Sequence, residues 1–459
     1  MLIQTINPAT EELLQSYKLL TNEQANTAIN AAHTSYLAWR QTAFSQRSQC
    51  MLAIAALLRE KQDDYALLMA REMGKPITAG KAEIEKCAWV CEHFAENAEA
   101  YLAPRSIKTE MEKSLVCYQP LGVVFAIMPW NFPFWQVFRF AAPTLMAGNA
   151  AILKHAPIST GTGQAIADLF LAAGFPANLF QHLPIDNAGA AAVIAHDKIV
   201  AVTLTGSERA GSTVAANATS HLKKVVLELG GNDPYLILAD ADLDLAARCV
   251  AASRLNNTGQ VCIAAKRTIV VQNVLDEFIN KIKIQAQTYK MGDPLDIATN
   301  FGPMARKDLR ATLHQQVMES KQQGAKLILG GDIPDRQGYY YPVTILTDVR
   351  PGMPAFDEEL FGPVIAIITA DNEQHAIELA NQSRYGLGAA VFTRDLVRGE
   401  RIAMHEIECG ACFVNAFVAS DPRLPFGGIK RSGFGRELSR EGIMEFVNTK
   451  TVAISGHRN

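Results

Sequence analysis

Short apolar runs alternate with helix-like segments through most of the chain, and this alternation restricts the fold more than any other feature. Strands separated by helices favour a parallel, right-handed, doubly wound sheet. Such a sheet binds ligands at the carboxyl ends of its strands. We therefore expect an α/β protein with two such sheets. The runs that read as strands lie at 122–128, 150–156, 178–184, 199–206 and 224–231, and then at 268–271, 325–331, 364–370 and 389–393.

A chain of 459 residues is too long for one ordinary hydrophobic core. We expect one domain from residues 1–105 and 122–229, and a second α/β domain, residues 230–432, that carries the reactive cysteine described below. Residues 106–121 and 433–459 contain strands without a place in either sheet. Such strands pair with each other or with another subunit, so we expect a small β element that joins the copies of an oligomer.

Composition and charge exclude several classes of function. The apolar content of 49% and charged content of 19% are those of a soluble globular protein. A net charge of −3 gives no general attraction to nucleic acid or to an anionic membrane. No signal peptide is read, and the eight cysteines are scattered, so we expect a cytoplasmic protein with reduced thiols. The most hydrophobic stretch is no membrane span, because it is interrupted by Pro129, Asn131, Pro133, Arg139 and Pro143.

The segment NNTGQVCIAAKR, residues 256–267, has the strongest chemical signal. A lone cysteine in an apolar segment is usually a small buried hydrophobe. Here polar, turn-forming residues precede Cys262, and the cations Lys266 and Arg267 follow it and favour the thiolate. Glu228, in the segment ELGGNDP, supplies a carboxylate on another glycine-containing loop. A thiol and a carboxylate on special loops suggest covalent catalysis with a separate base.

Asn131 lies between Pro129 and Pro133 on a rigid turn, where its amide group suits an oxyanion hole. The alternative is that its side chain caps its own turn. The segment TGSERAG, residues 205–211, closes an apolar strand, and its glycines allow a cofactor to approach a helix N-terminus. Residues 161–166 look like a dinucleotide fingerprint but lack its final glycine or alanine, so we do not expect them to bind phosphate.

Two other regions are expected to have no chemical role. The helical residues 21–101 contain nothing that suggests a site. Cys409 and Cys412 form a single CxxC without a second ligand pair, so no metal site is expected.

Taken together, the motifs resemble the NAD(P)-dependent aldehyde dehydrogenase superfamily, in the family's order and over essentially the whole chain. The resemblance implies that residues 1–105 and 122–229 bind NAD or NADP and that residues 230–432 are the catalytic domain. The motifs are PWNFP at 129–133, TGSxxxG at 205–211, ELGG at 228–231, GQxC at 259–262, ExFGPV at 359–364 and PFGGxKxSGxGRE at 425–437.

The resemblance also implies roles for the catalytic residues. Cys262 matches the nucleophile that attacks an aldehyde to give a thiohemiacetal and, after oxidation, a thioester. Asn131 matches the side chain that stabilises the oxyanion together with the Cys262 backbone N–H. Glu228 matches the base that activates water for hydrolysis of the thioester.

The implied cofactor residues come from several motifs. Lys154 and Glu359 match residues that hold the riboses. Pro157 stands where NAD-preferring members often carry a glutamate that accepts from the 2′-hydroxyl and repels a 2′-phosphate, so use of both NAD and NADP is expected. The remaining matches are Trp130 and Phe361 in the cofactor pocket and Gly206 and Ser207 beside the pyrophosphate.

Arg139 suggests the substrate. A cation in a segment rich in aromatic residues needs an anionic partner, and an arginine fork binds a carboxylate in two places. A similar arginine, and a serine at the position of Ser420, are features of compact bacterial succinate-semialdehyde dehydrogenases. We therefore expect oxidation of succinate semialdehyde to succinate with NAD(P)+ and water. The alternative for Arg139 is that it pairs with an acidic residue of the protein.

Three other functions stay open at this level. The first is an enzyme for another ω-carboxylated or a general aliphatic aldehyde, because one methylene changes binding by only about 1–3 kcal/mol. The second is transfer of the acyl group to coenzyme A, which the presence of Glu228 disfavours. The third is a non-catalytic binding protein on this fold. The expected partners are a small aldehyde and further copies of the chain, as a homodimer or homotetramer, with neither nucleic acid nor a membrane.

Overall fold

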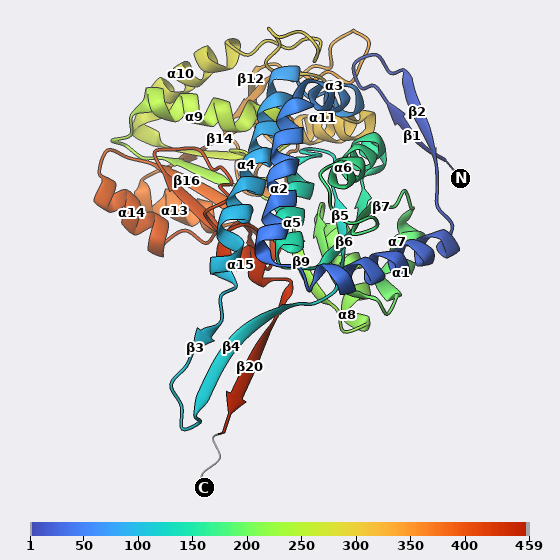
Figure 1. Ribbon diagram of the computed structural model, residues 1–459. Helices are drawn as coiled ribbons and strands as arrows, with labels where there is room; N and C mark the ends of the chain where they lie inside the picture. The colour runs from blue at the N-terminus through green and yellow to red at the C-terminus, as the bar shows by residue number, and fades with distance from the viewer. Residues whose placement is uncertain (1, 456–459) are drawn as a thin grey trace.

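The computed structural model describes residues 2–455 and contains two mainly parallel sheets covered by helices, with a smaller sheet that projects from the body (Figure 1). The predicted α/β fold class is confirmed. The first large sheet has the strand order β19-β9-β8-β5-β6-β7. Its strands are β5 (Val123–Met128), β6 (Ala150–His155), β7 (Phe180–His182), β8 (Ile199–Thr205), β9 (Lys224–Glu228) and the short β19 (Gly433–Phe434), which alone is antiparallel to its neighbour.

The direction of winding reverses at β5 in this sheet. From β5 the chain proceeds to β6 and β7 on one side, and then to β8 and β9 on the other. Ile127 of β5 pairs with both Lys154 and Leu204, and Thr205 pairs with Glu228. The carboxyl ends of these strands therefore meet at one edge, where the reversal opens a crevice for a ligand.

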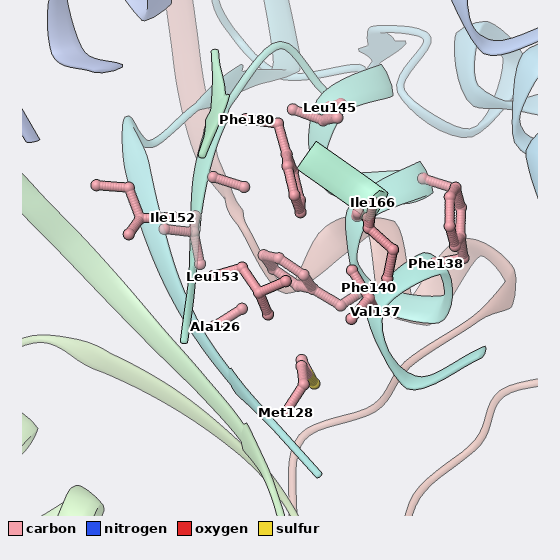
Figure 2. Packing of buried hydrophobic residues seen from close by; sticks show 14 of the residues in the cluster. Ala126, Met128, Val137, Phe138, Phe140, Leu145, Ile152, Leu153, Ile166 and Phe180 are labelled. Carbon is pink, nitrogen blue, oxygen red and sulfur yellow. The ribbon is translucent and has the colours of Figure 1, made fainter. Parts of the chain in front are cut away.

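Helix α5 (Trp135–Met146) follows β5, and all of its residues are buried. Figure 2 shows Val137, Phe138 and Phe140 of α5 packed with Ile166 and with side chains of the sheet. The Phe138 and Phe170 rings stack with centroids 5.5 Å apart. The apolar runs of the sequence thus form the buried layer between α5 and the sheet, and this packing holds the loop between β5 and α5 in position. The other helices of this half are α1 (Asn22–Trp39), α2 (Phe44–Glu60), α3 (Gln62–Met73), α4 (Ile77–Tyr101), α6 (Thr160–Ala172), α7 (Asn187–Ala195) and α8 (Glu208–Ser220).

The second large sheet has the order β12-β13-β14-β11-β10-β16-β17, and only β12 and β13 pair antiparallel. Its strands are β10 (Pro234–Ile237), β11 (Arg267–Val271), β12 (Lys326–Leu329), β13 (Thr344–Thr347), β14 (Val364–Ala370), β16 (Gly388–Phe392) and β17 (Ala411–Val414). Its helices are α9 (Leu243–Leu255), α10 (Leu275–Gln287), α11 (Lys307–Gln322), α12 (Pro354–Asp357), α13 (Glu373–Asn381) and α14 (Leu396–His405).

The projecting sheet has the order β20-β4-β3, with β3 (Arg105–Ser106), β4 (Lys113–Pro120) and β20 (Val447–Ile454). Val447 pairs with Pro120 and Ile454 with Lys113, so the two distant strands found in the sequence pair with each other. Helix α15 (Ser439–Met444), just before β20, instead packs on α4 and α5. Residues 1 and 456–459 of the predicted ranges lie outside the described residues.

Two small antiparallel sheets of two strands each complete the fold. One is the hairpin of β1 (Leu2–Ile6) and β2 (Leu13–Lys18), and the other pairs β15 (Tyr385–Gly386) with the distant β18 (Ile429–Lys430). Among residues 2–455, every helix is too short or too polar to cross a membrane.

Candidate active site

The loop that carries Cys262 begins with an unusual backbone turn. After α9, a 3₁₀ turn at Asn256–Gly259 places Asn257, Thr258 and Gly259 at φ values of 50°, 58° and 73°. A β-branched residue such as Thr258 rarely adopts this region and persists there only when its surroundings enforce it. Its hydroxyl donates to the Gly302 carbonyl at 3.1 Å, and the Asn257 amide donates to the Asn131 carbonyl at 2.7 Å.

Gly259 brings two of the motifs into backbone contact. A Cβ atom at this position would lie 2.2 Å from the Gly362 carbonyl oxygen, which belongs to the FGP segment. Only glycine fits this approach together with a positive φ. The following residue, Gln260, also fixes the loop, because its side chain accepts from the Ala305 N–H at 2.9 Å and donates to the Asn257 carbonyl at 3.2 Å.

The Cys262 thiol is partly buried. Burial raises its pKa to about 11, while Lys266 and Arg139 act to lower it. The Lys266 ammonium donates to the Val261 and Cys262 carbonyls at 2.8 and 2.5 Å. The predicted preference for the thiolate is therefore wrong for the chain alone, since desolvation of the charged form exceeds the effect of the cations.

Arg267 was also expected to assist the thiolate, and this prediction is wrong. Its guanidinium is fully buried and donates to backbone carbonyls of Asn232, Leu379 and Ala380. It therefore connects β11 to its neighbours and does not act on the thiol.

Asn131 lies on the turn between β5 and α5 and is 5% exposed. Its amide nitrogen donates to the Gln260 carbonyl at 3.0 Å, so the side chain contacts the cysteine loop and does not cap its own turn. His155 supports the same turn from β6. Its Nδ1 accepts from the Ala156 N–H, which leaves Nε2 to donate to the Pro133 carbonyl at 2.9 Å.

Glu83 of α4 fixes the other side of this turn. One of its oxygens accepts from the backbone N–H groups of Phe134 and Trp135, both at 2.9 Å. It thereby satisfies donors at the start of α5, where no side chain of the helix itself acts as a cap. Its other oxygen is ion-paired with Lys75, and both side chains of the pair are nearly inaccessible to solvent.

Glu228 lies at the end of β9 and is 2% exposed. Neither of its carboxylate oxygens has a hydrogen-bond partner among the described residues. Burial, followed by the neighbouring carboxylate of Glu437, raises its pKa well above the ordinary range, while Arg139 and Arg436 act in the opposite direction. In this arrangement Glu228 favours its protonated form.

A cavity of about 250 Å³ lies beside Cys262. Its walls are mostly apolar and aromatic, and the sequence-predicted residues Cys262, Arg139 and Ser420 all contribute to them. Glu228 and Asn131 are not part of this lining. The other lining residues that bear on the chemistry are Lys75, Glu83, Lys86, Phe132, Trp135 and Phe426.

Arg139 has a partner within the protein, as the alternative interpretation of the sequence held. It is 1% exposed and ion-paired with Glu437, which is 4% exposed. The guanidinium also lies over the Phe426 ring, 4.4 Å from its centroid. The argument that Arg139 requires a substrate carboxylate is thereby removed, although part of the residue still faces the cavity.

Residues 21–101 do contribute to the cavity, contrary to expectation, through Lys75, Glu83 and Lys86. The Lys86 ammonium donates to the Ser420 hydroxyl at 2.8 Å and lies 4.3 Å from the centroid of the Trp135 ring. One signal was available in the sequence: Glu83 lies on the apolar face of its helix, three residues after Gly80 and four before Cys87. A charge on such a face is rarely buried without a specific partner.

The residues expected to hold a cofactor gather at the carboxyl edge of the first sheet. Lys154 is the penultimate residue of β6, is 7% exposed and forms no salt bridge among the described residues. Gly206 precedes α8, whose first turn is capped by Ser207. Of the described residues, only the Leu204 side chain lies near the missing Cβ of Gly206. A helix N-terminus with open access of this kind suits a phosphate group.

The rings of Trp130 and Phe361 contact each other edge to face, with centroids 5.9 Å apart. Glu359 accepts from the Gly231 N–H at 3.1 Å and lies 3.2 Å from the Lys266 ammonium. This carboxylate thus joins the ELGG motif to the cysteine loop.

The N-terminus of α6 is occupied by a protein carboxylate. Glu72 accepts from the backbone N–H groups of Gly161 and Thr162 at 2.9 and 3.0 Å. This carboxylate occupies N–H donors that a phosphate would need, which supports the prediction that residues 161–166 are not a phosphate loop. Nearby, Pro157 is exposed at the start of a 3₁₀ turn, whereas the Ser159 hydroxyl is buried against His155 at 2.7 Å.

Comparison with known proteins agrees with this arrangement. The model of the aldehyde dehydrogenase family matches residues 1–452. The chain belongs to the aldehyde dehydrogenase family. It is 47% identical over 455 residues to a probable succinate-semialdehyde dehydrogenase (NADP+) of Synechocystis sp. strain PCC 6803, covering 99% of this chain and 100% of that one.

Two further relatives have similar names. The succinate semialdehyde dehydrogenase (NAD(P)+) of Escherichia coli K12 is 46% identical, with 98% of this aldehyde dehydrogenase and 97% of the relative covered. A crystal structure of succinic semialdehyde dehydrogenase from Streptococcus pyogenes with NADP+ superposes with a TM-score of 0.97 at 37% identity, covering 99% of this chain and 100% of that one.

Proposed function

We propose that this aldehyde dehydrogenase oxidises succinate semialdehyde to succinate with NAD(P)+ and water. One observation carries the proposal: a single small cavity is lined by the Cys262 thiol and also by the Ser420 hydroxyl and cationic side chains. Such a cavity favours an aldehyde whose end opposite the carbonyl group is polar and anionic. Relatives that are 46–47% identical over nearly the whole chain bear the name of this activity.

The crevice at the carboxyl edge of the first sheet fits a nicotinamide dinucleotide. Gly206 and Ser207 would hold the pyrophosphate, Lys154 and Glu359 the riboses, and Trp130 and Phe361 the walls beside Cys262. When bound, this cofactor supplies the acceptor for the electron pair that the substrate loses. We assign residues 1–105 and 122–229 to this NAD(P)-binding domain and residues 230–432 to the catalytic domain.

The chain's own residues perform the covalent chemistry. The Cys262 sulfur bonds to the aldehyde carbon, and the carbonyl electron pair moves onto oxygen, where the Asn131 amide and the Cys262 backbone N–H stabilise it. The thioester left after oxidation is attacked by water, Glu228 takes a proton from that water, and the C–S bond breaks to release the acid. Lys266 and Arg139 assist ionisation of the thiol, since both lower its pKa.

The proposal is tested by initial rates of NADH and NADPH formation with succinate semialdehyde, glutarate semialdehyde, butanal and benzaldehyde. We expect succinate semialdehyde to have the highest kcat/KM, followed by glutarate semialdehyde. An equal or greater kcat/KM for butanal or benzaldehyde contradicts the proposed substrate. Tight binding of cofactor without turnover of any aldehyde contradicts the proposed activity.

We further propose that copies of the chain associate as a homodimer or homotetramer in the cytoplasm. The projecting sheet has β3 and β20 at its two edges, and among the described residues no further strand lies beside either of them. All eight cysteines are free thiols, which suits a reducing compartment. Sedimentation equilibrium of the full chain measures the assembly directly, and a monomer at micromolar concentration contradicts it.

A further inference from the structure

The charges around the cavity leave one cation without a carboxylate partner. Four lining residues carry a formal charge, namely Lys75, Glu83, Lys86 and Arg139. Lys75 is ion-paired with Glu83, and Arg139 with Glu437. Lys86 forms no salt bridge with any residue in the described part of the chain. The lining therefore has an excess of one positive charge that the protein does not neutralise at short range.

The Lys86 ammonium group is held in place, although not all of its hydrogen-bond donors are used. Its ammonium group has three N–H donors, and the structure uses one of them, toward the Ser420 hydroxyl at 2.8 Å. The face of Trp135 lies 4.3 Å away and stabilises the cation further. Two donors stay available on a group whose position is already fixed, which reduces the entropy lost when an anion binds.

We infer that Lys86, oriented by Ser420 and Trp135, binds the carboxylate at the far end of the aldehyde substrate. This inference rests on the proposed function and extends it, because it assigns the specificity for ω-carboxylated aldehydes to a residue of α4. Arg139 acts beside it as a buried, ion-paired cation. Ser420 positions Lys86 and contributes its own hydroxyl to the same anion.

The electrostatic environment of Lys86 gives the inference a pH signature. Burial and the nearby Arg139 lower the pKa of Lys86 to about 8, although Cys87, Glu83 and Asp421 act to raise it. Lys86 is charged below this pH and neutral above it. The advantage of a carboxylated substrate over an uncharged one should therefore be largest below pH 8 and should decline as the pH rises through that value.

The test compares kcat/KM for succinate semialdehyde and butanal in the wild-type enzyme and in Lys86→Met, Lys86→Arg and Lys81→Met. We expect Lys86→Met to lower kcat/KM for succinate semialdehyde by about tenfold to a hundredfold, mostly through a higher KM. The kcat/KM for butanal should change by less than about twofold. Lys86→Arg should restore part of the loss. Lys81→Met is the matched control, since Lys81 lies on the same helix and pairs with the exposed Asp63.

The ratio of the two kcat/KM values is then followed from pH 6 to pH 10. Both substrates share the ionisations of Cys262 and Glu228, so the ratio isolates Lys86. A ratio that is unchanged in Lys86→Met, whether neither substrate is affected or both lose the same factor in kcat/KM, overturns the inference while the proposed substrate stands. If wild type shows no preference for succinate semialdehyde, the proposed function fails and the inference fails with it. Should Lys86→Met not fold, the wild-type ratio decides alone, and one that stays flat through pH 8 overturns the inference.

Discussion

Arg139, which lines the cavity, is ion-paired through its guanidinium with the Glu437 carboxylate, and both side chains are nearly inaccessible to solvent. Arg139 comes from α5 and Glu437 from the last motif of the chain, just before α15. The pair therefore joins the helix that follows the Asn131 turn to the C-terminal segment. It also influences catalysis, since Arg139 lowers the pKa of Cys262 and of Glu228, whereas Glu437 raises that of Glu228.

Breaking this pair should destabilise the protein strongly. Arg139→Met leaves Glu437 buried without its cation, and removal of one partner of a buried pair costs about 3–5 kcal/mol. We expect a clear fall in the midpoint of thermal unfolding, measured by circular dichroism, whether or not substrate is present. Arg59→Met is the control, because Arg59 pairs with Glu85 and Glu92 at the surface, where such a pair is worth about 0–1 kcal/mol. Equal shifts for the two variants contradict a structural role for the Arg139 pair.

Replacement of Glu437 should change the pH dependence of hydrolysis. Glu437→Gln removes a negative neighbour, so the pKa of Glu228 should fall and the rising limb of the steady-state rate should move to lower pH. The limb moves to lower pH because Glu228 must lose its proton to act as a base, and removal of a nearby negative charge favours its ionised form. Deacylation rates from pH 5 to pH 9 measure the shift. A limb that stays in place, or moves to higher pH, contradicts the coupling of the two carboxyls.

Glu228→Gln should separate the two halves of the reaction. The first turnover depends on Cys262 and Asn131, whereas thioester hydrolysis loses its base, which typically contributes about 10²- to 10⁴-fold. We expect a burst of NADPH equal to the enzyme concentration, followed by a slow steady state, and an acylated Cys262 in the mass spectrum. A proportional loss of burst and steady state would place Glu228 in the first half instead.

Much of this arrangement could be predicted from the sequence, for identifiable reasons. The buried strands are continuous apolar runs, so the sequence showed β5, β6, β8 and β9 almost to their ends. Pairing of β4 with β20 was one of two alternatives left open, the other being pairing with another subunit, because neither segment suited a large sheet. Cys262 and Asn131 were found through motifs whose glycines and prolines have local backbone reasons, and the contact between the Asn131 amide and Gln260 brings them together.

The missing parts depend on contacts between residues far apart in the chain. Lys86 and Ser420 are separated by 334 positions, and neither has a local pattern that names the other. The pairing of Arg139 with Glu437 likewise required the three-dimensional structure to choose between a protein and a substrate partner. The raised pKa of Cys262 was missed because neighbouring cations are visible in a sequence, whereas desolvation depends on packing.

Alkylation of Cys262 should show its raised pKa directly. Only the thiolate reacts, so in the enzyme without cofactor the rate with iodoacetamide should rise about tenfold per pH unit from pH 7 to pH 10, with no plateau, because the pKa of about 11 lies above this range. Lys266→Met should slow the reaction at each pH, since Lys266 lowers that pKa. Peptide mass spectrometry distinguishes Cys262 from the other thiols. A plateau near pH 7 would show that the thiol is ionised in the resting enzyme.

Asn131→Ala should lower kcat by about 10²- to 10³-fold, the usual effect of losing one oxyanion donor. The loss should appear in the burst phase, because the oxyanion forms when Cys262 attacks. The alkylation rate of Cys262 should change little, which distinguishes a lost donor from a displaced loop. Asn257→Ala provides the comparison, since Asn257 holds the Asn131 carbonyl and its loss should disturb the loop and alter alkylation as well.

Lys154 and Pro157 should set the balance between the two cofactors. Lys154 is buried near the end of β6 and has no salt bridge within residues 2–455. Burial lowers its pKa, so a cofactor oxygen or phosphate would supply the partner that it lacks there. We expect Lys154→Met to raise KM for both cofactors, and by about tenfold or more for NADP+.

Pro157→Glu places a negative charge at the exposed start of the 3₁₀ turn that follows β6. It should raise KM for NADP+ by about tenfold and change KM for NAD+ by less than about twofold, because only NADP+ carries the 2′-phosphate. Pro157→Gln is the neutral control of similar size. If the glutamate and glutamine variants discriminate equally, charge at residue 157 does not select the cofactor, and the selection must come from elsewhere along the crevice.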